Sequence, residues 1–466
     1  LEFRRVLFRS ADVQTFISLF LGLVGEAPGI LLESAEVDGR LGRYSLLAWD
    51  FRMQLSPAGG KLAVDTDDPD LQPLKEHAGK PFLEGLKAVL HELHIDQGGL
   101  NLPPLTRGLI GSFGYGLAAM FEPRLADAID VDAAEARLVL PGKAVLFDHL
   151  RHRCCYLSLG EPGDPAFSQP AWAQEAAPEG AVSPTARPDQ DAYKAGVERA
   201  KALIADGEAI QVVLSTRFSA PVAEAPFAVY RRLRQANPSP FMFFMRFTDG
   251  TLLGSSPEML VRSSGGHLEV RPIAGTRPRG VDDAEDEALA EELLADPKER
   301  AEHVMLVDLG RNDLGRIATP GSVEVSRFMQ VERFSHVMHL TSYVHARLKD
   351  GLDAVDVLAA TFPAGTVSGA PKIRAMEIIA DIESMERGPY AGAIGWMGLG
   401  DDAADLDTGI TIRSMWFSGG VCHWQAGAGI VYDSDPEKEW QECNNKARVI
   451  REVLGGKEAG DVFAHR

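Results

Sequence analysis

Apolar positions are spaced differently in the two halves of the chain. The first half contains short apolar runs separated by turn residues, which is typical of strands. Examples are RYSLLAWDF (43–51), LTRGLIGSFGYG (105–116) and KAVLFDHLRHRCCYLSLG (143–160). Residues 161–190 are rich in Pro, Gly, Ala and acidic residues without periodicity, which predicts a linker or exposed loop. The pattern therefore predicts an N-terminal region (11–160), this linker and a C-terminal region (191–466).

The C-terminal region begins with a helical pattern and continues with strands. DQDAYKAGVERAKALIADGEA (189–209) has the spacing and the N-cap of an amphipathic helix. The runs that follow predict strands: IQVVLSTRFSA (210–220), FMFFMRF (241–247), TLLGSS (251–256) and HLEVRPI (267–273). Several of these runs are separated only by short turns, which favours antiparallel pairing. The sequence therefore predicts an α+β fold with large antiparallel sheets rather than a doubly wound fold.

Two further helices are expected within residues 295–316 and 432–454, and each begins with an Asp-Pro cap. Each helix then places two glutamates at i, i+3 on one face: Glu299 and Glu302 in the first, Glu439 and Glu442 in the second. Acidic first turns are also common as solvated faces stabilised by the helix dipole. The functional alternative is a Mg²⁺ site, because Mg²⁺ binds oxygen ligands and keeps positions for water and an anionic substrate.

Two glycine-rich segments could hold an anion. FPAGTVSGAPKIRAMEII (362–379) contains a loop that runs into a helix, and QAGAGIVYDSDP (425–436) precedes the second acidic helix. Exposed N–H groups in such turns can cradle a carboxylate, although most glycine-rich turns are only turns, and neither segment has nucleotide-binding spacing. Glu258 and His339 are the acid–base candidates by residue type, with a structural hydrogen bond as the alternative for each.

Composition narrows the class of protein. The chain has 67 acidic against 47 basic residues and a formal net charge of −20, so we expect no nucleic-acid partner. Its four cysteines lack CxxC spacing, which indicates a reduced, cytoplasmic setting. The apolar run FISLFLGLVG (16–25) is too short to span a bilayer, so we expect no membrane association. Residues 1–10 lack an initiator Met and are interpreted as a linker remnant.

Together these segments resemble the chorismate-utilising enzymes, and among them the large subunits of anthranilate synthases. The matching segments are collinear and span nearly the whole chain: LLESAE (31–36), NPSPFMFFM (237–245), GSSPEMLVR (254–262), RPIAGTRPRG (271–280), VERFSHVMHLTS (331–342), FPAGTVSGAPK (362–372), RGPYAGAIG (387–395) and QAGAGIVYDSDPEKEWQECNNKA (425–447). The resemblance implies two large antiparallel β-sheets packed as a sandwich with helices outside. It also implies conversion of chorismate and ammonia to anthranilate and pyruvate, the first committed step of tryptophan biosynthesis.

The resemblance also implies roles for single residues. Glu302 and Glu442 would ligate Mg²⁺, with Glu299 and Glu439 close by. Glu258 would be the general acid for the departing 4-hydroxyl group of chorismate, and His339 would assist the later loss of pyruvate. The residues implied to bind the substrate are Thr276, Thr366, Tyr390, Arg413, Gly427, Ala428 and Gly429.

Two positions separate members of this family. Isochorismate and salicylate synthases carry a lysine where this chain has Gln211, which cannot be a general base for water. Aminodeoxychorismate synthases carry a lysine nucleophile where this chain has Ala274, which cannot form a covalent adduct. Of the reactions known in this family, direct attack of ammonia on chorismate is the one that these two residues allow. Component I of aminodeoxychorismate synthase, in the folate pathway, is the alternative function.

The resemblance implies two further partners. The sequence has no Gly-x-Cys-x-Gly nucleophile elbow, so a separate glutamine amidotransferase subunit would supply the ammonia. L-Tryptophan would be a feedback inhibitor that contacts Glu33, Ser34, Pro240, Phe241 and Met242. Phe241 stands where the family usually has tyrosine, and a core strand is the structural alternative for the LLES segment.

Overall fold

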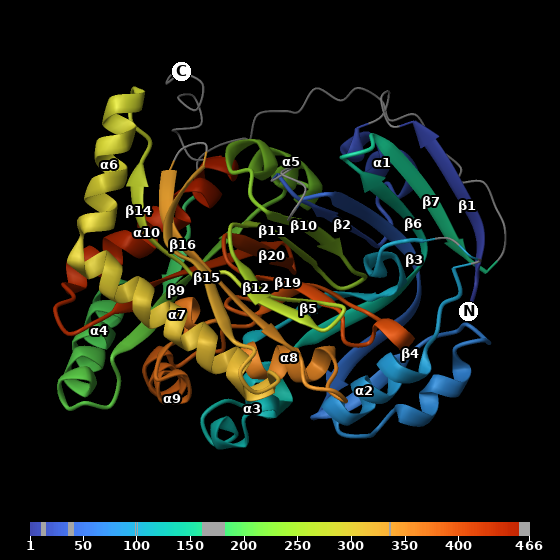
Figure 1. Ribbon diagram of the computed structural model, residues 1–466, viewed down its shortest axis with the longest axis horizontal. Helices are drawn as coiled ribbons and strands as arrows, with labels where there is room; N and C mark the ends of the chain where they lie inside the picture. Colours follow the sequence, from blue (N-terminus) through green and yellow to red (C-terminus); the bar gives the residue numbers. More distant parts are fainter. Residues whose placement is uncertain are drawn as a thin grey trace.

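Antiparallel pairing organises the chain into two sheets that are joined where the long strand β3 (Tyr44–Ala58) pairs with the long strand β6 (Ala136–Asp148) (Figure 1). The computed structural model describes residues 1–10, 15–35, 42–97, 99, 101–160, 182–334 and 337–455, and only the backbone of residues 3–10. Within this part of the chain, no helix is long and apolar enough to cross a membrane.

The first sheet leads from β3 to the strands that follow the predicted linker. Its hydrogen-bonded order is β3, β2 (Gly29–Glu33), β10 (Phe241–Arg246), β11 (Thr251–Ser256), β20 (Ser414–Ser418), β21 (Val421–Ile430) and β9 (Gln211–Pro221), with β8 (Thr185–Arg187) and β17 (Gly369–Ala370) also paired to β9.

The second sheet leads from β6 in the other direction. Its order is β6, β5 (Leu109–Phe113), β18 (Ala393–Met397), β19 (Leu406–Ile410), β12 (Met259–Ser264), β13 (His267–Val270) and β16 (Val337–Arg347), which also pairs with β14 (Ile273–Pro278) and β15 (Glu324–Arg333). At the margin, β4 (Lys61–Asp65) pairs with β3, and β7 (Arg153–Leu159) lies between β6 and β1 (Phe3–Ser10).

Strands in the middle of the sandwich, such as β10 and β11, are buried on both faces, which explains their continuous apolar runs. In β10, Phe243 and Met245 belong to the core shared with the second sheet, whereas Phe244 belongs to a separate core beneath two helices. These helices are α1 (Phe16–Leu23) and α5 (Pro226–Ala236). The rings of Phe20 and Phe227, one from each helix, stack with centroids 4.4 Å apart, and Phe244 lies edge-on to both.

Helices cover the outside of the sandwich. Besides α1 and α5 they are α2 (Phe82–Glu92), α3 (Ala118–Phe121), α4 (Gln190–Ala205), α6 (Asp283–Ala295), α7 (Pro297–Ile317), α8 (Ala354–Thr361), α9 (Lys372–Glu383) and α10 (Pro436–Val453). Both predicted Asp-Pro caps are present: Asp296 accepts hydrogen bonds from the backbone at the start of α7, and Asp435 does so for α10. The predicted fold class is confirmed.

The predicted division of the chain stays a prediction. Residues 161–181, most of the expected linker, lie outside the described residues. The N-terminal region supplies strands to both sheets, because β2 pairs with β10 and β5 pairs with β18. The backbone of residues 3–10, interpreted as part of a linker remnant, pairs with β7.

Truncation of Phe244 tests the core beneath α1 and α5. We expect Phe244→Ala to lower the free energy of unfolding by about 3–5 kcal/mol, because it leaves a cavity at a fully buried aromatic position. Urea unfolding followed by circular dichroism measures the change. The same substitution at Phe328, which is 52% exposed, is the control and should have a much smaller effect. Equal effects would contradict this account of the core.

Candidate active site

Glu258 stands directly before β12, beside a small cavity. Burial raises the pKa of its carboxyl group to about 7, although Thr366, Lys446 and Arg413 all act in the opposite direction. The Thr366 hydroxyl is buried next to this carboxyl group. The cavity is lined by Glu258, Thr366, Gly365, Leu309, Asp313 and Arg271, among others. A carboxyl group that stays protonated near neutral pH in such a place can donate a proton to a ligand.

His339 reaches the same region from β16. Its Nδ1 lies 2.8 Å from the carbonyl oxygen of Gly275 and 3.1 Å from the hydroxyl of the exposed Thr276. The carbonyl can only accept, so Nδ1 carries the hydrogen and Nε2 keeps its lone pair. Burial lowers the pKa of His339, and the cation of Arg413 adds to this. His339 is therefore a neutral imidazole that can accept a proton.

Arg413 supplies a cation that solvent can reach. It lies between β19 and β20 with φ of +49°. Its side chain is exposed to solvent on one side and packed by protein on the other. Burial lowers its pKa, while the carboxylate of Glu258 acts against this. Its guanidinium donates to Asn237 Oδ1 at 3.4 Å, a partner that the sequence pattern did not reveal. An accessible guanidinium is suited to bind a carboxylate.

β21 brings its glycines against two predicted site residues. A Cβ atom on Gly427 would lie 2.8 Å from the Tyr390 hydroxyl oxygen, and one on Gly429 would lie 2.6 Å from Gln211 Nε2. At Gly427 the Cβ would also lie 2.7 Å from the carbonyl oxygen of Leu214, so this position requires glycine, whereas at Gly429 only the Gln211 side chain would have to move. The Ala428 side chain between them is buried in a small core, so only its backbone could contact a ligand. The ladder between β21 and β20 ends at Trp424, which leaves this stretch without a strand partner on that edge among the described residues.

α7 and α10 bring the two predicted glutamate pairs together. Burial raises the pKa of Glu302, and the charges of Glu299 and Glu442 raise it further, whereas a hydrogen bond from Gln211 lowers it. Burial and Glu442 likewise raise the pKa of Glu439. Carboxylates that repel one another in this way favour a bound cation. Within the described residues no three of these side chains bring ligand atoms within 4.8 Å of one another. Mg²⁺ nevertheless fits such a set, since it often binds only one or two carboxylates and completes its shell with water and substrate.

Lys446 is a site residue that the motif analysis missed. Its Nζ lies 2.8 Å from Glu442 Oε1 and donates to the carbonyl oxygen of Gly427 at 2.9 Å. The ammonium group therefore links α10 to β21 and forms an ion pair with one carboxylate of the glutamate cluster. The i, i+4 spacing of Glu442 and Lys446 was the available signal in the sequence.

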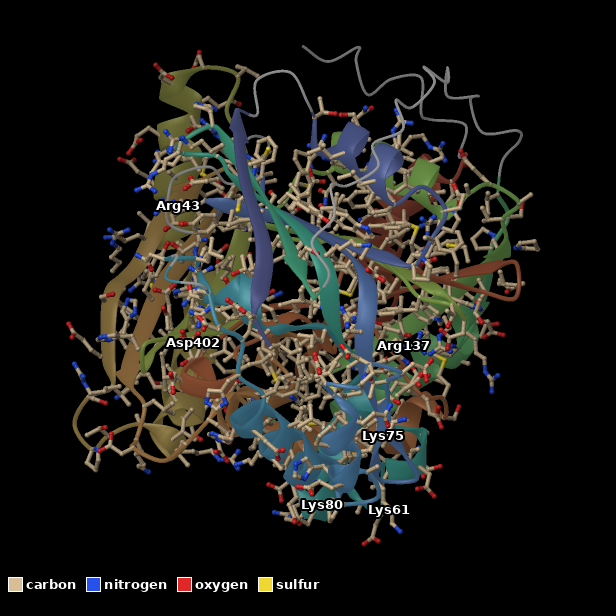
Figure 2. The ribbon with its side chains drawn as sticks, turned by 90° about the vertical axis from the view of Figure 1, so that its right-hand side faces the viewer. Arg43, Lys61, Lys75, Lys80, Arg137 and Asp402 are labelled. Atoms are coloured by element: carbon tan, nitrogen blue, oxygen red, sulfur yellow. The ribbon has the colours of Figure 1, made fainter. Side chains whose placement is uncertain are left out.

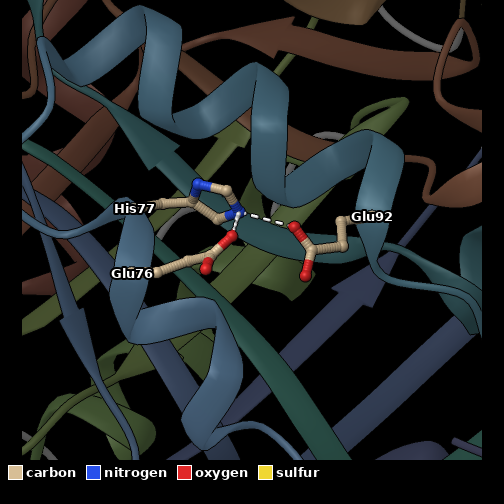
Figure 3. Close-up of side chains that lie close together, drawn as sticks. All are labelled: Glu76, His77 and Glu92. Atoms are coloured by element: carbon tan, nitrogen blue, oxygen red, sulfur yellow. Dashed lines mark hydrogen bonds and ion pairs between the residues drawn. The ribbon is translucent and has the colours of Figure 1, made fainter.

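A second cluster, formed by Glu76, His77 and Glu92, is the only described group with three such ligand atoms within 4.8 Å (Figure 3). His77 Nε2 lies 2.6 Å from Glu92 Oε2, and Lys80 Nζ lies 2.9 Å from His77 Nδ1. The ammonium group can only donate, so Nδ1 accepts, and Nε2 carries the hydrogen that points at Glu92. That tautomer leaves no lone pair for a metal.

The surroundings of this second cluster are also cationic. Figure 2 shows Lys61, Lys75 and Lys80 together at the lower end of the molecule. The histidine cluster is therefore a hydrogen-bonded link between α2 and the short helix η1 (Gln72–His77) rather than a metal site.

Pairing of β2 with β10 gathers the residues predicted to contact tryptophan. Glu33 is buried opposite Met242, and its carboxylate accepts hydrogen bonds from the Tyr230 hydroxyl at 2.7 Å and from Arg234 Nε at 2.9 Å. The ring of Phe241 packs on the backbone of Gly409. The two remaining predicted contacts, Ser34 and Pro240, are half-buried and adjoin this pair of strands. Tyr230 and Arg234 were missed because α5 is distant in sequence from β2.

Comparison with known proteins shows the family to which the chain belongs. Residues 49–452 match the family model described as chorismate binding enzyme. The chain is 41% identical to anthranilate synthase component 1 of Thermus thermophilus over 97% of each protein, and 41% identical to that of Streptomyces coelicolor over 95% of this chain and 87% of the relative. The crystal structure of anthranilate synthase component I from Streptococcus pneumoniae superposes with a TM-score of 0.74 at 34% identity, covering 95% of this chain and 98% of the other.

More distant structures share the fold alone. The menaquinone-specific isochorismate synthase MenF from Escherichia coli has a TM-score of 0.70 at 23% identity and covers 97% of this chain and 94% of its own. The α+β sandwich with its acidic helices is therefore that of a chorismate-utilising enzyme. The chain belongs to the chorismate binding enzyme family, and the two relatives with which it shares 41% identity are named anthranilate synthase component 1.

The raised pKa of Glu258 predicts a pH-dependent stability. Below about pH 4.5 the carboxyl group is protonated in both the folded and the unfolded protein. As the pH rises towards 7, the unfolded protein loses this proton first. The free energy of unfolding therefore decreases with rising pH in this range. Between pH 4 and pH 8 the wild type should therefore lose up to about 3 kcal/mol relative to Glu258→Gln. Urea unfolding at several pH values measures this. Glu291→Gln, on the exposed face of α6, should leave the pH dependence unchanged. Parallel curves for all three proteins would refute the assignment.

Proposed function

We propose that this chain is the large subunit of an anthranilate synthase, a lyase that converts chorismate and ammonia to anthranilate and pyruvate in tryptophan biosynthesis. The observation that carries the proposal is the meeting of a protonated acid, Glu258, with the accessible cation of Arg413. The names of the relatives over nearly the full length of the chain support the same reaction. Aminodeoxychorismate synthase is less well supported, because Ala274 offers no nucleophile.

Charge complementarity explains how the site would hold chorismate, which carries two carboxylates. Arg413, Tyr390 and the unpaired edge of β21 would bind the enolpyruvyl carboxylate, with Thr366 along the ring and Thr276 beside His339. Glu302 and Glu442 would hold Mg²⁺, and Glu299 and Glu439 beside them would contact the ion through water molecules. When bound, Mg²⁺ would neutralise the ring carboxylate and withdraw charge from the conjugated ring.

The first chemical stage is substitution at the ring. Glu258 donates its proton to the 4-hydroxyl group, which leaves as water. Ammonia forms a bond to C2 as the ring double bonds shift towards C4, and the new ammonium group then gives up a proton. Gln211 lies against Glu302 rather than serving as a base, so water is not activated in place of ammonia.

The second stage makes the ring aromatic. The C2 proton is removed, the bond between C3 and the ether oxygen breaks, and pyruvate leaves as its enol. His339 assists this loss of pyruvate, because its Nε2 lone pair can accept a proton at neutral pH. The hydrogen bond from Nδ1 to Gly275 fixes this tautomer.

Two partners follow from the same proposal. Ammonia would come from a glutamine amidotransferase subunit, a component II that the name component 1 of the relatives implies. L-Tryptophan would bind between Glu33, Ser34, Pro240, Phe241 and Met242. Because Tyr230 and Arg234 already hold the Glu33 carboxylate, we propose that they set its orientation towards the inhibitor.

Removing Lys446 tests the metal assignment. We expect Lys446→Met to bind Mg²⁺ about three- to tenfold more tightly, because the ammonium group no longer competes for the exposed Glu442 carboxylate. Isothermal titration calorimetry with MgCl₂ measures this without turnover. Lys438→Met removes the same charge from the same helix and should change the affinity less. If the two variants bind Mg²⁺ equally well, Lys446 does not face the metal.

Product identification tests the reaction. Chorismate with ammonium and Mg²⁺ should yield fluorescent anthranilate, and added L-tryptophan should lower the rate. Glu302→Gln should reduce turnover at least about 100-fold, because a ligand of the catalytic ion is lost. Glu437→Gln, at an exposed position of α10, is the matched control and should remain active. Formation of 4-amino-4-deoxychorismate instead would show that the alternative function is correct.

A further inference from the structure

Arg387 and Glu383 form a fully buried ion pair at the end of α9. Their side chains are 1% and 2% exposed. Arg387 Nε donates to Glu383 Oε2 at 2.8 Å, and Nη2 donates to Oε1 at 2.6 Å, so the contact is bidentate. The chain leaves α9 at Ser384 in a left-handed conformation with φ of 46°, which lets Arg387 fold back onto the last residue of the helix.

The guanidinium also binds two backbone segments of the candidate site. Nη1 donates to the carbonyl oxygen of Val367 at 2.7 Å, and Nη2 donates to that of Val213 at 2.7 Å. Val367 adjoins Thr366 in the short helix η6 (Gly365–Val367), and Val213 lies two residues after Gln211 in β9. One side chain therefore fixes the loop that carries Thr366 to the strand that carries Gln211.

The carboxylate extends the same network to β21. Glu383 Oε1 accepts hydrogen bonds from the backbone N–H and the hydroxyl of Ser215, both at 2.7 Å. Gln425, which lies two residues before Gly427 in β21, donates from Nε2 to the Ser215 hydroxyl at 2.8 Å. The ion pair thus connects to the strand whose glycines adjoin the site.

Aromatic rings enclose the guanidinium. Its central carbon lies 4.8 Å from the ring centroid of Tyr115 and 5.5 Å from that of Tyr390. Attraction between a cation and an aromatic face is strong where water is excluded. The contact with Tyr390 links Arg387 to a further residue of the proposed substrate site.

We propose that Arg387, held by Glu383, is a positioning residue that sets the distances between Thr366, Gln211 and Tyr390 in the chorismate site. This inference rests on the proposed function. Arg387 touches none of the reacting atoms itself, since it contacts the backbone behind Thr366 and Gln211 and the face of the Tyr390 ring.

Stability alone does not explain this pair. Burying two charges removes them from water, and an apolar pair of similar volume is often at least as stable. Apolar side chains, however, could not form the hydrogen bonds that hold the carbonyl groups of Val367 and Val213 to the guanidinium and the N–H of Ser215 to the carboxylate. What the pair provides is a defined arrangement of three segments that are distant in the sequence.

Replacement of the fork by a single ammonium group tests the inference. Arg387→Lys keeps the charge but cannot reach Glu383, Val367 and Val213 together. We expect the KM for chorismate to rise at least about tenfold, and the chorismate affinity measured by calorimetry without ammonium to fall similarly, because misplaced binding groups lose productive geometry. Arg52→Lys is the matched control. Arg52 belongs to β3, a strand that lies away from α7 and α10 in Figure 1, and its substitution alters an ion pair with the buried Asp68 and should leave KM unchanged.

The outcomes separate this inference from the proposed function. A wild type that binds chorismate without forming anthranilate would refute the reaction alone, and the affinity comparison would still test the positioning role. Equal affinity and KM in wild type and Arg387→Lys would overturn the positioning role. If Arg387→Lys does not fold, Ser215→Ala replaces it, because this change removes only the hydroxyl between Glu383 and Gln425. It should raise KM several-fold with little change in the melting temperature, and an unchanged KM would overturn the inference.

Discussion

The long antiparallel pairing of β3 with β6 is the constraint on which the rest of the structure depends. One side of this ladder continues through β2 into the first sheet, and the other continues through β5 into the second. The two sheets are thereby brought face to face, so that Phe243 of the first and Leu406 of the second share a core. The candidate site receives Gln211 and the β21 glycines from the first sheet, and Glu258 and His339 from the second. The relative positions of these site residues are therefore set by the packing of the two sheets.

Desolvation of ionisable groups controls the chemistry that this packing permits. Burial raises the pKa of the Glu258 carboxyl group and lowers the pKa of the His339 imidazole, because it disfavours the charged form of each. A protonated acid and a neutral base can consequently stand in one site at the same pH. Burial also raises the pKa of Glu302, and the negative charges of Glu299 and Glu442 raise it further. A cation at these carboxylates would relieve that repulsion while leaving the acid and the base in their states.

Local features of this protein could be predicted from the sequence, and contacts across it could not. The Asp296 cap and the spacing of Glu299 and Glu302 depend on neighbouring residues, so the helix and its acidic face followed from the pattern. The apolar run FMFFMRF (241–247) likewise predicted the strand β10. Nothing local reveals that Arg234 holds Glu33, or that Arg387 reaches Val213, because these contacts join residues more than 170 positions apart. The resemblance to a family supplied candidate residues, and the fold shows which backbone groups hold them in place.

The nature of the nucleophile links these observations. Ala274 is buried in β14 opposite Leu340, and Gln211 is engaged with Glu302, so neither position contributes a nucleophile or a base. Under the proposed function the nucleophile must therefore enter from outside. Ammonium would be attracted to the crowded carboxylates, but it has no lone pair to form the new bond. Neutral ammonia has one, and the burial that disfavours the charged forms of Glu258 and His339 also favours uncharged ammonia next to them. A partner that releases ammonia next to this site, without passage through bulk water, would match its electrostatics better than free ammonium would.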